Sequence, residues 1–113
     1  MGLLAIDTQT NKEVWLYLQS VPYGPKRTHV SIYYKPLPLL VDCKTITPEN
    51  FGEGWERFEI TPDGSAYSTF CMTADKQIAF LYERANIAGQ WLYDICFEKL
   101  SIEQITHGRY TIK

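Results

Sequence analysis

The sequence has little of what marks nucleic-acid binding, membrane insertion or export. Its longest basic cluster is the pair Lys26-Arg27 and its formal charge is −2, so no basic stripe that follows a phosphate backbone is predicted. No run approaches the roughly 20 apolar residues that span a bilayer. Asp7 interrupts the short apolar run from Leu3 to Ile6 before a signal-peptide core of about 7–15 residues could form. We therefore predict no nucleic-acid partner, no membrane span and no signal peptide in this chain.

Cysteine and histidine are also scarce. Cys43, Cys71 and Cys96 are odd in number and include no C-x-x-C pair, so neither a disulfide framework nor a metal site is predicted. Cys71 and Cys96 lie within apolar strand patterns, and we expect both to be buried thiols that pack as small hydrophobic groups. His29 and His107 have no ligand-like neighbours and are interpreted as structural or exposed.

The residues that are abundant favour one β-rich globular unit. The 113 residues fit a single domain over 1–113, and a hydrophobic fraction of 45% supplies a modest core. Runs of β-branched and aromatic residues, separated by proline and glycine, predict strands over 14–21, 29–35, 55–60, 67–73, 77–84, 91–100 and 109–112. One helical turn is expected after Thr47 and another over 102–105. We predict an all-β fold of about two antiparallel sheets, each a meander of three or four strands.

In two of the predicted strands, the order of apolar and polar residues indicates which faces are buried. Val30, Ile32 and Tyr34 alternate with more polar residues, which is typical of a strand with one buried side. The strand over 77–84 is apolar on both sides, and such strands are usually covered on both sides. Stacked propeller blades give antiparallel sheets that kind of environment.

Four short segments stand out when they are considered in order along the chain. They are Lys26-Arg27, Ser65-Ala66-Tyr67-Ser68-Thr69, Phe80-Leu81-Tyr82-Glu83 and Tyr93-Asp94-Ile95-Cys96-Phe97. Taken singly, the key residues have plain structural interpretations. Tyr67 is one of eight tyrosines and packs a strand end, Arg27 is a solvated loop residue, and Glu83 pairs with Arg84 or faces water.

Together these segments resemble the C-terminal part of bacterial and animal sialidases, where a Tyr-Ser pair precedes a strand, a turn and a Leu-Tyr-Glu strand. The resemblance implies that the sheets correspond to about the last two blades of a six-bladed β-propeller. It further implies that Tyr67 is the catalytic nucleophile, that Arg27 binds the sialic acid carboxylate, and that Glu83 supports one of the family's carboxylate-binding arginines.

These residue types suit the chemistry of sialic acid. The sugar carries a carboxylate on its anomeric carbon, and the planar guanidinium of arginine binds a carboxylate bidentately. A carboxylate nucleophile would be repelled by that group, whereas a tyrosine oxygen is not, and sialidases are known exceptions to the paired-carboxylate scheme of glycosidases.

The chain also departs from the family pattern. The Asp acid/base, two further arginines, the glutamate that activates the tyrosine, and the Ser-x-Asp-x-Gly-x-x-Trp repeat have no counterpart in it. We therefore expect part of an exo-α-sialidase that releases terminal sialic acid with retention and needs no metal or cofactor, the chain alone being inactive. The alternative is a truncated propeller remnant that serves as a glycan- or protein-binding module.

The expected partners follow from the same interpretation. They are sialylated glycoconjugates and either the rest of the propeller or a self-associating copy. The resemblance implies a secreted or periplasmic location.

Overall fold

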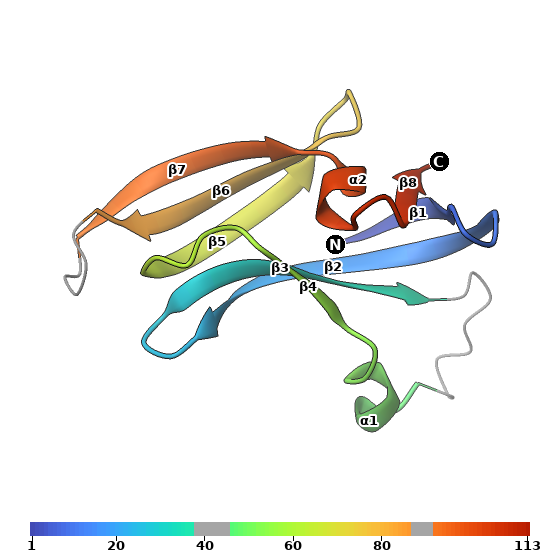
Figure 1. Cartoon of the computed structure of the whole chain (residues 1–113), viewed down its shortest axis with the longest axis horizontal. Helices are drawn as coiled ribbons and strands as arrows, with labels where there is room; N and C mark the ends of the chain where they lie inside the picture. Colours follow the sequence, from blue (N-terminus) through green and yellow to red (C-terminus); the bar gives the residue numbers. More distant parts are fainter. Residues whose placement is uncertain (38–45, 87–91) are drawn as a thin grey trace.

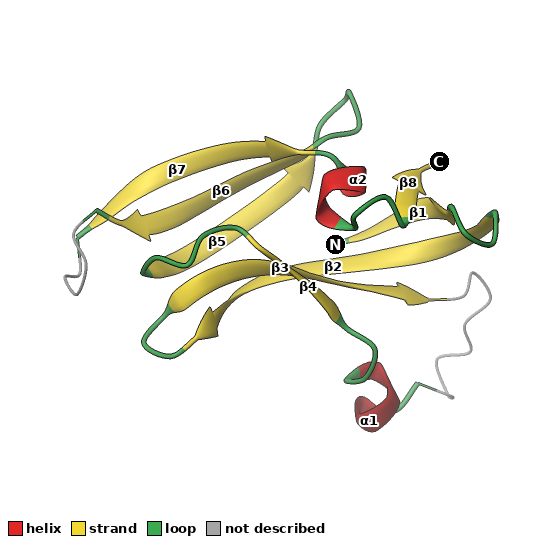
Figure 2. Cartoon of the chain, viewed as in Figure 1, coloured by secondary structure: helices red, strands yellow, loops and turns green. Residues whose placement is uncertain are grey.

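Two antiparallel sheets make up most of the described chain, which in this computed structural model comprises residues 1–37, 46–86 and 92–113. The five-stranded sheet has the order β4-β3-β2-β1-β8, formed by β1 (Gly2–Asp7), β2 (Lys12–Gly24), β3 (Thr28–Leu37), β4 (Glu56–Glu59) and β8 (Tyr110–Ile112). The three-stranded sheet has the order β5-β6-β7, formed by β5 (Ser65–Met72), β6 (Ile78–Ala85) and β7 (Tyr93–Leu100). Two short helices, α1 (Pro48–Phe51) and α2 (Ile102–Ile105), complete the described elements (Figure 2). The predicted β-rich fold of two antiparallel sheets is confirmed, but the prediction that each is a meander of three or four strands was wrong for the first sheet, which has five strands and includes β8 beside β1.

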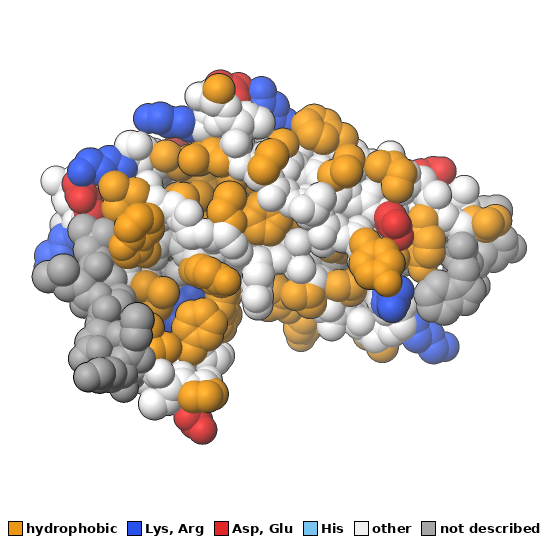
Figure 3. Space-filling view, turned by 180° about the vertical axis from the view of Figure 1, so that it is seen from behind, with side chains coloured by type: hydrophobic (Ala, Val, Ile, Leu, Met, Phe, Trp, Pro, Cys, Tyr) orange, Lys and Arg blue, Asp and Glu red, His pale blue; other side chains and the backbone are white. Residues whose placement is uncertain are grey.

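The two sheets form two layers with the core between them. In Figure 1 the three-stranded sheet lies above β2 and β3, and α1 projects below them. The core joins side chains of both sheets and of α2, among them Leu16, Ile32, Phe80 and Ile105, all fully buried. Charged side chains lie in small separated groups on the surface seen from behind (Figure 3).

The alternation predicted for β3 is confirmed, since Val30, Ile32 and Tyr34 are buried in the core. Ser31 on the opposite face is also fully buried, and its hydroxyl accepts a hydrogen bond from Arg57 Nη1 (3.2 Å). Ser31 is therefore shielded from solvent by the neighbouring strand β4, which carries Arg57.

The strand predicted over 14–21 was too short, because β2 continues through Pro22 to Gly24. Pro22 pairs with Val30 of β3, while the pairing of β2 with β1 reaches only Tyr17. Proline is tolerated where one edge of a strand has no partner, since its missing N–H then breaks no ladder bond. The run that begins at Leu3, taken from the sequence only as a short apolar stretch, is strand β1.

The two predicted helical turns are present and both begin with a capping box. Thr47 accepts a hydrogen bond from the Asn50 amide before α1, and Ser101 accepts one from the Gln104 amide before α2. Neither helix of the described ranges has the length or apolar character that crossing a membrane requires.

The prediction of two buried thiols was wrong for Cys71, which is exposed, while Cys96 is only partly buried. Cys43 lies outside the described residues. Cys71 stands opposite Ala79 on the side of the three-stranded sheet that faces away from the core. On that side no described element covers the sheet, so the expectation that β6 is covered on both faces was also wrong.

Candidate functional site

A β-bulge presents Tyr67 at the start of β5. Ser65 pairs with Arg84 and the regular pairing resumes with Ser68 opposite Tyr82, so Ala66 and Tyr67 stand together opposite Glu83. An extra residue in one strand re-aims side chains, and such bulges are common beside active sites. Here Ala66 is buried, whereas the side chain of Tyr67 is 72% exposed.

The turn between β2 and β3 brings Arg27 to this bulge. Lys26 and Arg27 both have φ of +56°, a left-handed backbone that costs a non-glycine residue about 1–2 kcal/mol. The turn is tied to β5, because the Arg27 carbonyl accepts a hydrogen bond from the Ser65 amide (2.7 Å) and Thr28 bridges Gly64. The Arg27 guanidinium carbon consequently lies 5.6 Å from the centre of the Tyr67 ring.

Tyr67 and Glu83 also line one shallow, open hollow on the outer side of the three-stranded sheet. Its lining consists of Tyr67, Ser68, Thr69, Leu81, Tyr82, Glu83 and Ile95. Tyr82 is itself buried in the core, and this burial raises the pKa of its phenol. The hollow thus offers apolar surface and hydroxyls beside one carboxylate.

Some charged side chains around the hollow form ion pairs, and others form none with the described residues. Arg84 does not pair with Glu83 but binds Asp63, with Nη2 to Oδ2 at 2.7 Å, and this hydrogen bond raises the pKa of the guanidinium. Among the described residues, neither Arg27 nor Glu83 makes an ion pair within 4 Å. Arg27 is left facing the Tyr67 ring as an exposed cation, free to meet an anion. The inferred support of an arginine by Glu83 stays a prediction.

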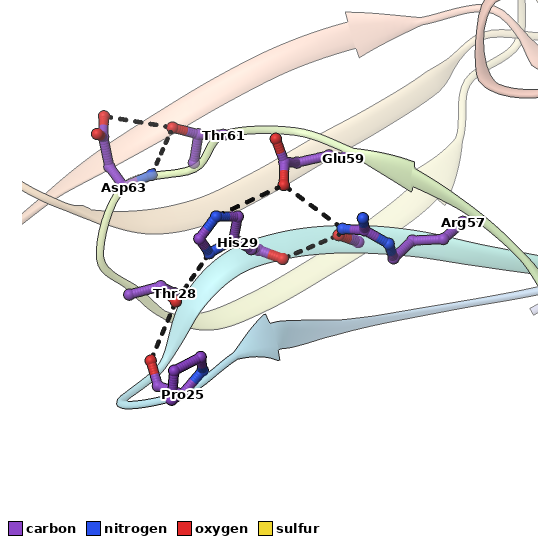
Figure 4. Close-up of polar contacts among 8 residues, drawn as sticks. Pro25, Thr28, His29, Arg57, Glu59, Thr61 and Asp63 are labelled. Carbon is purple, nitrogen blue, oxygen red and sulfur yellow. Dashed lines mark hydrogen bonds and ion pairs between the residues drawn. The ribbon is translucent and has the colours of Figure 1, made fainter.

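Figure 4 shows a polar cluster behind the Arg27 turn that the sequence did not reveal. His29 Nε2 lies 3.9 Å from Glu59, and Arg57 Nη1 lies 3.4 Å from the same carboxylate. The ring of His29 contacts Thr28, whose hydroxyl donates to the Pro25 carbonyl (3.0 Å). These contacts hold in place the turn that carries Arg27. The alternation of Arg57 and Glu59 along β4 was the signal available in the sequence.

Two serines with different surroundings lie on either side of the bulge. Ser68 Oγ lies 2.8 Å from Ser20 Oγ on β2, which links the two sheets. Ser65 is fully buried, and its hydroxyl has no hydrogen-bond partner within the described part of the chain. In the same part of the chain, no group of three or more histidine, cysteine or acidic side chains is placed to hold a metal ion.

Arg27, Tyr67 and Glu83, separated by 40 and 16 residues in the sequence, thus meet at one end of the sheets. Comparison with known proteins gives no match, whether to a family model, a curated protein or a solved structure.

Proposed function

We propose that this chain forms part of an exo-α-sialidase, in which the Arg27–Tyr67 pair binds terminal sialic acid. The observation that carries the proposal is the position of the Arg27 guanidinium over the exposed Tyr67 ring, with Glu83 opposite Tyr67 across the bulge. A cation that has no acidic partner in the described part of the chain, beside a tyrosine ring, suits a sugar that carries a carboxylate at its reacting carbon.

In this proposal the three residues have separate tasks. Arg27 binds the sugar carboxylate, and the Tyr67 oxygen attacks the anomeric carbon as the bond to the leaving group breaks. The phenolic proton must pass to a base and the leaving oxygen must receive one from an acid. Glu83 holds an arginine of the carboxylate site. The sheets would stand as about the last two blades of a six-bladed propeller in an exported protein.

The chain alone is expected to bind without turnover, because the groups that would move those two protons have no counterpart in its sequence. We expect millimolar binding of free sialic acid by calorimetry. Arg27→Ala should weaken it about tenfold or more, since a hydrogen-bonded charge contributes about 1.5–3 kcal/mol. Lys26→Ala, in the same turn with the same φ, is the matched control and should change the affinity less than about threefold.

Three results would count against this proposal. They are the absence of binding at millimolar sugar, equal losses in the two turn variants, and unchanged binding of the sugar's methyl ester, which lacks the carboxylate charge. Cleavage of a chromogenic α-sialoside by the purified chain, abolished by Tyr67→Phe, would contradict the expected lack of turnover.

A second candidate is a binding module without catalysis, which recognises a glycan or another protein. The observation that favours it is the uncovered apolar surface around the hollow, where Ile95 is 68% and Phe97 62% exposed. Binding that depends on Phe97 and not on Arg27 would support this second function over the first.

A further inference from the structure

The side of the three-stranded sheet that faces away from the core is a continuous surface, which we call the outer face. It is formed by Tyr67, Thr69, Cys71, Ala79, Leu81, Glu83, Ile95, Phe97 and Lys99. Leu81 stands directly opposite Phe97, and Glu83 directly opposite Ile95. Four large apolar side chains are exposed there: Tyr67, Leu81, Ile95 and Phe97. Contiguous exposed apolar surface of this kind marks an interaction site.

The charges of the outer face lie at its two ends. Glu83 is at the end where β5 starts, and Lys99 is at the opposite end, near the close of β7. Lys99 Nζ donates to Asp75 (2.7 Å), but an ammonium has three donors and keeps capacity for a second carboxylate. Between these ends the face carries only apolar and small polar side chains.

The opposite surface of the molecule has a different shape. Three rings, Tyr17, Phe51 and Trp55, contact one another edge-on with centroids 5.6–5.9 Å apart, where α1 and the segment after it stand against β2. In Figure 1 α1 projects from this side of the five-stranded sheet. A flat partner therefore fits the outer face of the three-stranded sheet better than this one.

We propose that the outer face binds the outer face of a second copy of this chain in a two-fold symmetric dimer. With the two-fold axis perpendicular to the strands, the facing strands run in opposite directions, so Glu83 of each copy meets the end of the other copy that carries Lys99 while the apolar centres pack together. Closed two-fold dimers are the commonest assemblies, and each surface then needs to complement only itself. Packing two sheets face to face is also the ordinary way to bury two apolar sheet surfaces.

The dimer proposal does not depend on the proposed function, although the dimer contact and the sialic acid site share part of one surface. Its contact would cover Tyr67 and Glu83, so sialic acid and the second copy would compete for the same end of the sheet. Arg27 lies on the turn beside that face, and Phe97 is not among the residues that line the hollow. The two sites can therefore be disturbed separately.

Sedimentation velocity of the full chain over a concentration series tests the dimer, with a reductant to keep Cys71 from forming a disulfide. We expect a concentration-dependent dimer. Phe97→Glu should raise its dissociation constant about thirtyfold or more, because buried aromatic residues at the centre of an interface contribute about 2 kcal/mol or more. Tyr23→Glu is the matched control: Tyr23 is also 62% exposed but lies on β2, and the dimer should persist. Circular dichroism melting checks that both variants fold.

A charge reversal tests the orientation. Glu83→Lys should weaken the dimer, and adding Lys99→Glu together with Asp75→Asn, which removes the carboxylate that Lys99 pairs with, should restore it, because the contact then pairs the same charges with reversed signs. A monomeric wild type at about 100 μM, an equal effect of Tyr23→Glu and Phe97→Glu, or a failure of the double reversal to restore association would each overturn the proposal.

Discussion

Arg27 reaches Tyr67 because of the backbone of the turn before β3. Gly24 ends β2, and the side chains of Thr28 and His29 occupy the space that a Cβ at this position would need. A Cβ at this position would overlap Thr28 Oγ1 and stand 2.6 Å from His29 Nδ1. These two residues follow Arg27 directly, so space at Gly24 allows the turn to hold its left-handed residues against β5.

We predict that Gly24→Ala destabilises the fold by about 1–3 kcal/mol through this overlap and weakens sialic acid binding as Arg27 shifts. Urea denaturation and calorimetry measure the two effects. Gly2→Ala is the control, since the nearest atom to its Cβ would be Tyr17 Cδ2 at 4.0 Å, and it should change the stability by less than about 0.5 kcal/mol. Equal stability of the two variants would contradict the role given to Gly24.

At the level of elements, the two helices have the same cap but different surroundings. Both begin with a capping box, yet α1 buries no side chain, whereas α2 buries Ile102 and Ile105 in the core. A short helix gains most of its stability from packing rather than from its own hydrogen bonds. Loss of the cap should therefore affect global stability only where the helix belongs to the core.

Ser101→Ala is predicted to lower the free energy of unfolding by about 1 kcal/mol, as expected for removal of an N-cap hydroxyl. Thr47→Ala should change it by less than about half that amount, because α1 can fray without disturbing the core. Chemical denaturation of both variants compares them directly. A larger effect of Thr47→Ala would mean that α1 is part of the cooperative unit.

Across the whole molecule, the first and last strands are joined at Asp7 and Arg109. β8 pairs with β1, and Arg109 donates from Nε and Nη2 to the two carboxylate oxygens of Asp7, each at 2.8 Å. Asp7 is buried, and the hydrogen bond from Arg109 holds the pKa of its carboxyl well below the usual range. This contact ties together residues that are 102 positions apart in the sequence.

A carboxyl whose pKa is lower in the folded than in the unfolded state stabilises the fold above its unfolded pKa, about 3.9, and loses that effect as the pH falls. We predict that wild-type stability drops from pH 7 to pH 3 and that Asp7→Asn, already less stable at pH 7, drops less. Asp75→Asn removes an exposed carboxyl whose pKa is also lowered, by its hydrogen bond from Lys99, and serves as the comparison. Identical pH dependence in wild type and Asp7→Asn would refute the prediction.

The sequence by itself determined most of the strands and the two helical turns, because these depend on local spacing and residue type, whereas it missed β1 and named the candidate site residues only through a family resemblance. It did not reveal that β2 passes Pro22, since this depends on how far β1 extends beside it. Nor did it reveal the exposure of Cys71, which follows from an outer face without a described neighbour. The bulge opposite Glu83, the hold of β5 on Arg27 and the pairing of Arg84 with Asp63 were decided by tertiary structure alone, because each joins residues on separate strands whose register no local pattern specifies.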